Sequence, residues 1–188
     1  MKFASVQTEP ASEPVTLAEL RSWLRIDGHD EDADLARFIT AARIAVENRT
    51  WSKLISQTID LSLDAFAEPI QLQFPPVASI TSITYTATSG NAQTVNSSVY
   101  ELGELDGMPV VRLQYSQTWP TPRAHPDSVT VRYVSGYGSS GSDVPQPIRD
   151  AIKMHAAHGW WNRGDAAGPP LPEAFTDLLS PYSHRMIR

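Results

Sequence analysis

Three glycines in residues 131–152, VRYVSGYGSSGSDVPQPIRDAI, have the spacing of a dinucleotide-binding fingerprint. Gly136, Gly138 and Gly141 form G-x-G-x-x-G after a segment rich in β-branched residues and before a helical pattern. In a dinucleotide-binding protein this turn opens directly into a helix whose N-terminus faces the pyrophosphate. Here SDVPQP delays the helix, no parallel strand with an acidic residue follows, and no G-K-[ST] occurs. We therefore expect no nucleotide site and interpret the glycines as a strand-to-helix loop that needs positive φ and little side-chain bulk.

Other residue combinations that could support chemistry are also incomplete. The acidic run from Asp27 to Asp32 lacks the alternating oxygen ligands and distal Glu of a calcium loop, so we interpret it as a solvated helix N-terminus. His155 and His158 have no further ligand at metal-binding spacing. The chain has no cysteine and no G-x-S-x-G elbow. The GWW at 159–161 favours core packing or a subunit interface. We expect no enzyme activity, no metal and no cofactor.

Composition narrows the class of protein further. Of 188 residues, 41% are hydrophobic and 19% charged, which is typical of a folded protein. The formal net charge of −6 argues against a protein that mainly grips nucleic acid phosphates. No segment has the roughly 20 apolar residues of a membrane span, and the N-terminus lacks the apolar region of a secretory signal, so we expect no membrane contact.

Two helices are predicted over 16–50, after a flexible lead at 1–15. Thr16 and Glu19 form a capping box at the start of the first helix, and RIDGHD, with Gly28 as the turn residue, ends it. Asp30 is the expected cap of the second helix, which should run to about Thr50. Its apolar stripe has the i, i+3, i+4, i+7 pattern and consists of Leu35, Phe38, Ile39, Ala42 and Val46.

The pattern changes to period-two alternation over 53–135. Short segments such as TIDLSLDAF, ASITSITYTA and SVTVRYV are rich in β-branched residues and separated by turn signals, which predicts antiparallel strands. A third helix is expected over 147–163, followed by a linker and tail at 164–188. The predicted fold is α+β: a single domain at 16–163 in which about three helices form a bundle with an inserted antiparallel β-meander, plus an extended C-terminal tail.

The stretch PVTLAELRSWLRIDGHDEDADLARFITAARIAVENRTW resembles the opening of the small head–tail connector (neck adaptor) proteins of tailed bacteriophages and related gene-transfer particles. Their usual opening is two helices around an acidic turn. PPVASITSITY, VTVRYVSGYG, VP with IRDAI, NR at 162–163 and LLSPYSHRMIR are similar to later pieces of that family. The order of these motifs is more specific than any one of them. The resemblance covers the chain from Pro14 to Arg188.

This resemblance implies a non-enzymatic protein of the virion neck, assembled in the bacterial host cytoplasm. Copies would form a ring, dodecameric in the family, beneath the portal protein at the capsid vertex. The ring would extend the DNA channel, which DNA passes without sequence-specific binding, and would carry a stopper or other neck or tail protein. Related tails read PYRxxR, whereas this one has His184 and Met186, so tail contacts are not carried over side chain by side chain.

Two alternatives come from other functional classes. The β-region, with aromatics such as Tyr137 and Trp119, is compatible with a small ligand- or carbohydrate-binding β-module with helical flanks. An enzyme is motivated only by the glycines and histidines described above.

The tail is the predicted portal contact. Pro169, Pro170 and Pro172 are expected to hold it away from the main body, so that its apolar residues lack an intramolecular contact. Folding of the tail back on the chain's own helices is the alternative. The isolated protein is expected to be monomeric or weakly associating and to form its ring on the portal. The predicted partner-binding residues are Phe175, Leu178, Leu179, Tyr182, Arg185 and Arg188.

Overall fold

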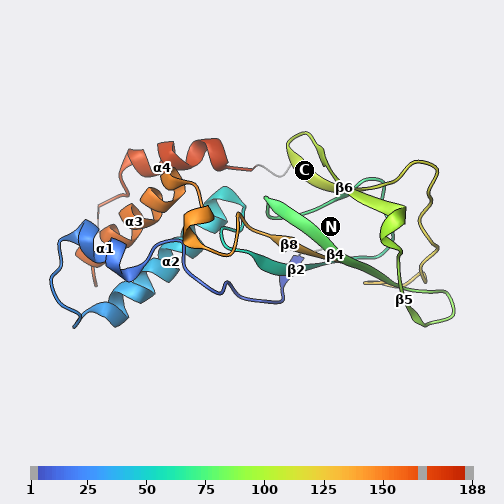
Figure 1. Ribbon diagram of the computed structural model, residues 1–188, viewed down its shortest axis with the longest axis horizontal. Helices are drawn as coiled ribbons and strands as arrows, with labels where there is room; N and C mark the ends of the chain where they lie inside the picture. Colours follow the sequence, from blue (N-terminus) through green and yellow to red (C-terminus); the bar gives the residue numbers. More distant parts are fainter. Residues whose placement is uncertain (1–3, 165–168, 185–188) are drawn as a thin grey trace. The chain divides into compact units, whose positions relative to one another are not determined.

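Helices and strands separate into two units of the chain (Figure 1). The computed structural model describes residues 4–164 and 169–184. One unit consists of 1–9 and 56–137 and contains the strands, and the other consists of 10–55 and 138–188 and contains the α-helices. Four helices with antiparallel strands confirm the α+β class.

The helical unit begins with the predicted capping box. Thr16 Oγ1 accepts from the backbone N–H of Glu19, whose carboxylate in turn accepts from the Thr16 backbone, so two orphan donors are paired. The expected cap at Asp30 is wrong, because Glu31 occupies the N-cap position of the second helix without a side-chain cap bond. The helices are α1 (Leu17–Leu24), α2 (Asp32–Thr50), α3 (Gln146–Trp161) and α4 (Glu173–Leu179).

The apolar faces of these helices form one core. Leu35, Ile39 and Val46 of α2 are buried as predicted, and α3 packs along α2. Phe38 meets Trp160 edge to face, and the two tryptophans of GWW differ, since Trp160 is 8% exposed and Trp161 is 71% exposed. Among the residues that the structure describes, no helix is long and apolar enough to cross a membrane.

The strands form two antiparallel sheets rather than one meander. The larger has the order β1-β2-β8-β4-β5 and the smaller the order β3-β7-β6. Strand β8 lies between β2 and β4, so it pairs with strands far from it in sequence, for example Ile59 with Tyr133 and Ile83 with Val131. The strands are β1 (Ala4–Val6), β2 (Gln57–Leu63), β3 (Ile70–Gln71), β4 (Val77–Thr86), β5 (Ala92–Thr94), β6 (Tyr100–Leu105), β7 (Met108–Leu113) and β8 (Val129–Ser135).

Within the flexible lead expected at 1–15, residues 4–6 form a strand and residues 12–13 make hydrogen bonds to the helical unit. Strand β1 pairs with β2, placing Ala4 opposite Leu61 and Val6 opposite Ile59. Further along, Ser12 donates to the carbonyl of Ser139 and Glu13 accepts from α2. The sequence signal was weak because a three-residue edge strand derives its stability from its partner and not from its own propensity.

Candidate functional site

The glycine loop pairs several of its own backbone donors internally. The Ser140 N–H donates to Asp143 Oδ2 (2.9 Å), the Asp143 N–H to the Ser140 carbonyl (3.1 Å), and the Ser142 N–H to Ser140 Oγ (3.3 Å). These are the kinds of backbone donors that a phosphate would need. Helix α3 begins only at Gln146, after the short 3-10 helix η2 (Gly141–Asp143). The predicted delay between the glycines and the helix is confirmed.

Each glycine has a local steric reason that does not involve a ligand. Gly136 has φ +133°, which other residues rarely adopt. A Cβ on Gly138 would lie 2.1 Å from the Asp143 carboxylate, which caps η2. A Cβ on Gly141 would lie 2.7 Å from the Pro14 carbonyl oxygen. The interpretation of the glycines as a strand-to-helix loop of restricted bulk is therefore confirmed.

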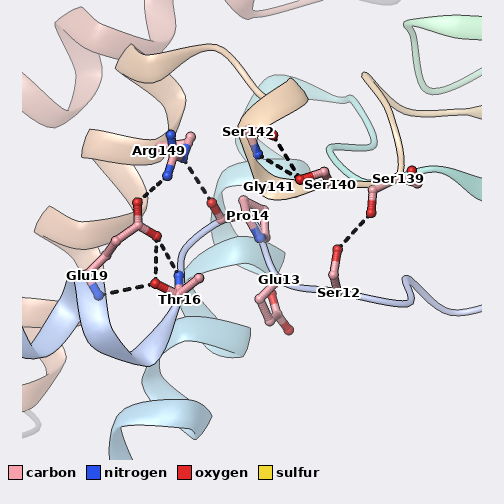
Figure 2. Close-up of a pocket in the computed structure, with 10 residues that line it drawn as sticks. All are labelled: Ser12, Glu13, Pro14, Thr16, Glu19, Ser139, Ser140, Gly141, Ser142 and Arg149. Atoms are coloured by element: carbon pink, nitrogen blue, oxygen red, sulfur yellow. Dashed lines mark hydrogen bonds and ion pairs between the residues drawn. The ribbon is translucent and has the colours of Figure 1, made fainter.

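The glycine loop borders a pocket of about 450 Å³ within the helical unit, most of whose lining residues are of polar types (Figure 2). Glu19 and Arg149 form an ion pair across it, and Arg149 Nε also donates to the Pro14 carbonyl oxygen (3.1 Å). The lining residues are Ser12, Glu13, Pro14, Thr16, Glu19, Ser139, Ser140, Gly141, Ser142 and Arg149.

The pKa of Glu19 in this pocket favours a structural role for its carboxylate over a role as a catalytic acid or base. Burial raises the pKa of Glu19. Hydrogen bonds from Thr16 and the charge of Arg149 lower it by more than burial raises it, so the pKa lies below its ordinary value of 4.5. A general acid or base near neutral pH needs the opposite shift. Arg149 joins the start of α3 to the segment before α1, which is a positioning role for both helices.

A second polar network, which the sequence analysis did not single out, lies on α2. Arg43 Nε donates to Glu13 Oε2 (2.9 Å), and its Nη1 lies 3.5 Å from Glu47 Oε2. Glu47 also receives Lys53 Nζ (3.0 Å) and the Leu54 N–H (3.2 Å), so these buried charges are paired. The available signal was the position of Arg43 and Glu47, four residues apart, directly after the buried Ala42 and Val46 of the apolar stripe.

The two histidines of α3 contact the tail. His155 packs against Phe175 with ring centroids 5.7 Å apart, and His158 Nε2 donates to the Pro169 carbonyl (2.7 Å). Burial, together with the charge of His158, lowers the pKa of His155. No group of three or more His, Cys, Asp or Glu side chains that could hold a metal occurs within 4–164 and 169–184.

The acidic turn before α2 is organised by side chains from α1. Arg21 Nη1 donates to the Gly28 carbonyl (3.1 Å), and its Nε lies 3.6 Å from Asp32 Oδ1. His29 Nδ1 also contacts Asp32 (3.0 Å). This carboxylate lies at the first residue of α2, where the helix dipole favours negative charge.

The tail packs on its own unit, so the premise that its apolar residues lack an intramolecular contact is wrong. Phe175 is 4% exposed and Leu179 is buried, because α4 lies against α3. Arg49 stacks over the Phe175 ring and donates to Thr176 Oγ1 (3.1 Å). The prolines thus do not hold the segment away, since the Pro169 carbonyl itself meets α3.

The other predicted tail residues that the structure describes are less buried than Phe175 and Leu179. Leu178 and Tyr182 are half-buried, the latter in the 3-10 helix η3 (Ser180–Tyr182). The His184 N–H donates to the Thr50 carbonyl at the end of α2 (3.0 Å). Arg185 and Arg188 lie outside the described residues. The structure thus brings Phe175 and Leu179 into the helical core, and portal binding by this set stays a prediction.

Of the two aromatics that suggested a carbohydrate module, Trp119 is already packed against other side chains. Trp119 stacks on Phe66 with ring centroids 4.8 Å apart and planes within 4°, and its Nε1–H donates to Glu68 Oε2 (2.9 Å). A sugar-binding platform needs a free aromatic face. This side chain instead anchors a loop of the β unit.

Residues 14–104 match the model of the family described as phage gp6-like head-tail connector protein. This match confirms the resemblance to head–tail connectors that the sequence motifs indicated. Among curated protein sequences, none matches this chain.

Solved structures share the fold over the whole chain. A chain from the neck of an empty gene transfer agent particle, computed with C6 symmetry, has a TM-score of 0.85 at 24% identity, and the alignment covers 100% of this chain and 98% of that one. A chain from the virion of a native gene transfer agent particle gives 0.83 at 24%, with the same coverage. A chain from the native neck computed with C12 symmetry gives 0.82 at 23%, again covering 100% and 98%. The likeness confirms the α+β fold.

Proposed function

We propose that this chain is a structural head–tail connector of a tailed phage or phage-like particle. Copies form a ring under the portal protein, extend the DNA channel and carry the next neck or tail protein, such as a stopper. The observation that carries the proposal is the connector-family match over 14–104, on a chain whose fold is shared end to end with chains from gene transfer agent particles. The protein acts in the virion neck after assembly in the bacterial cytoplasm.

A ring of twelve copies is the proposed assembly. The similar neck chains come from structures computed with C6 and C12 symmetry. In a closed ring each copy uses two different surfaces, which meet as the rotation closes. Helix α2 exposes Ala41 and Ile44 beside the charged Arg37, and Trp161 adds an exposed ring at the end of α3. These features suit side-by-side packing of helical units.

The charge of the chain suits passage of DNA rather than its retention. A protein that binds duplex DNA tightly neutralises phosphates with Lys and Arg and releases counterions. This chain has 15 such residues against 21 Asp and Glu. Several of the basic groups are already paired, such as Arg43 with Glu13 and Arg149 with Glu19. Sequence-specific DNA binding is not part of the proposal.

The tail remains the proposed portal contact, with altered roles for its residues. Phe175 and Leu179 hold α4 on the helical unit, while the half-buried Leu178 and Tyr182 offer their exposed surface to the portal. Arg185 and Arg188 are proposed to meet acidic groups or backbone oxygens there. Repetition around a ring makes a weak individual contact firm.

The proposed function is tested with the purified full-length protein and capsids that carry or lack portal. We expect rings at the single portal vertex of the first capsids and no binding to the second, by electron microscopy and co-sedimentation. Mass photometry of the protein alone should find monomers. Binding that is independent of portal, or no binding at all, would contradict the proposal. A variant with Leu178→Ala and Tyr182→Ala should lose attachment, whereas Gln93→Ala on β5 should keep it.

A further inference from the structure

The loop between β7 and β8 carries Tyr115, the most exposed of the large hydrophobic side chains described in the β unit. It spans 114–128, longer than most connections in compact domains, and such loops are often functional. Tyr115 is 97% exposed. Tyrosine is enriched among the residues that dominate protein–protein binding energy, because it supplies a large rigid ring with a polar tip.

The loop is held in place by the connection between β2 and β3 and by the end of β4. The ring of Trp119 stacks on Phe66, and both Trp119 Nε1 and the Leu113 N–H donate to the Glu68 carboxylate (2.9 and 3.2 Å). Further along, the Arg123 N–H donates to the Thr86 carbonyl (2.8 Å). Such a loop loses little conformational entropy when a partner binds.

A tight turn projects Tyr115 from this anchored loop. The Gln114 N–H donates to the Val99 carbonyl (2.9 Å), and the Gln117 N–H donates back to the Gln114 carbonyl (3.0 Å). Ser116, at the third position of the turn, has φ +59°. The turn therefore places Tyr115 at its second position, where the side chain is almost fully accessible.

The chemistry of the turn favours a protein partner over nucleic acid or a membrane. No charged residue occurs between Arg112 and Arg123. Tight binding to DNA draws on Lys and Arg that neutralise phosphates, and a membrane-binding element needs a wider apolar face, usually with basic residues. A single aromatic side chain in an uncharged turn instead suits a pocket on a folded protein.

The area of the turn favours a different protein over a second copy. One tyrosine buries roughly 150–250 Å², whereas a stable interface needs about 800 Å² per partner. The turn alone is too small to join neighbouring subunits in solution. Presented many times around a ring, it can hold a partner that is itself assembled in register.

We propose that the Tyr115 turn, residues 114–117, is the site at which this protein binds the component added after it. Tyr115 inserts its ring into an apolar-walled pocket that also has a partner for the phenol hydroxyl. The inference rests on the proposed connector function and assigns the downstream contact to the β unit, while the tail of the helical unit serves the portal.

The test compares wild-type protein with Tyr115→Ala, Tyr115→Phe and Leu105→Ala. Leu105 is an exposed apolar residue at the end of β6 and serves as a matched control. Each protein is added to portal-bearing capsids, and purified tails of the same particle are then supplied. Attachment to capsids is measured by co-sedimentation, and tail joining is counted by electron microscopy. All four proteins should attach to capsids equally. Tyr115→Ala should reduce tailed particles at least tenfold, Tyr115→Phe less than Tyr115→Ala, and Leu105→Ala not at all.

Each contrary outcome has a distinct meaning. Normal tail joining by Tyr115→Ala overturns the inference. Loss of capsid attachment in Tyr115→Ala would place the turn on the portal, and loss of ring formation would place it at the contact with a second copy; either result overturns the inference. Binding of duplex DNA that depends on Tyr115 also overturns it. Wild-type protein that fails to attach to portal-bearing capsids would overturn the proposed function itself, before tails are added.

Discussion

Replacing Phe175 by alanine tests directly whether the tail helix α4 is part of the folded helical unit. The ring is 4% exposed and contacts His155 and Arg49. A buried Phe→Ala change commonly costs about 3–5 kcal/mol. Because α4 has seven residues, the variant can release the helix rather than keep a cavity, so we expect a loss of about 2 kcal/mol. For a chain of this size that lowers the Tm by about 4–8 °C.

The measurement is thermal unfolding by far-ultraviolet circular dichroism, with hydrogen exchange of the α4 amides. Phe175→Ala should lower the Tm and remove protection from α4. Asp177→Ala, an exposed position of the same helix, should change the Tm by no more than about 1 °C. If Phe175→Ala unfolds at the wild-type temperature and α4 exchanges no faster than before, the packing argument is refuted. Deletion of 173–188 should also lower the Tm, because it removes the buried Phe175 and Leu179.

Two further substitutions and one ligand titration have defined outcomes. Gly141→Ala should destabilise the protein by about 1–3 kcal/mol in urea unfolding, because its Cβ would meet the Pro14 carbonyl; unchanged stability would show that the loop can move away. Burial lowers the pKa of His155 below 6.5, so the folded state favours the neutral ring. The free energy of unfolding should therefore fall as the pH drops below the pKa that His155 has in the unfolded chain. His155→Asn should flatten this dependence, and an equal slope in both proteins would exclude His155 as its source. Calorimetry with ATP or NAD should detect no binding, since the loop amides are already paired, and micromolar affinity would contradict this.

The start of α1, the apolar stripe of α2 and the character of the glycine loop were predictable because they depend on neighbours in the chain. A capping box needs only Thr16 and Glu19, three residues apart, and the apolar stripe of α2 needs only a regular spacing. The delay of several residues between Gly141 and α3 likewise excluded a dinucleotide fingerprint without any tertiary information. The connector motifs were visible in the same way.

The order of strands could not be predicted from the same signals. Alternation in β2 and β8 shows which face of each strand is buried, but it does not say which strand lies beside which. The pairing of Ile59 with Tyr133 joins residues that are distant in the chain, and it is decided by packing across the whole sheet. Strand β1 was missed for the same reason, because its hydrogen-bond partner is β2.

The sequence by itself therefore determined the local elements, the α+β class and the connector motifs. Only the tertiary structure decided where the tail lies, because the apolar spacing of Phe175 and Leu179 is equally suited to a partner protein and to α3. It also decided that Glu13 and Glu47 hold Arg43 in a buried network and that the turn at 114–117 exposes Tyr115. Burial and exposure are properties of what packs against a residue, and that is set by contacts far along the chain.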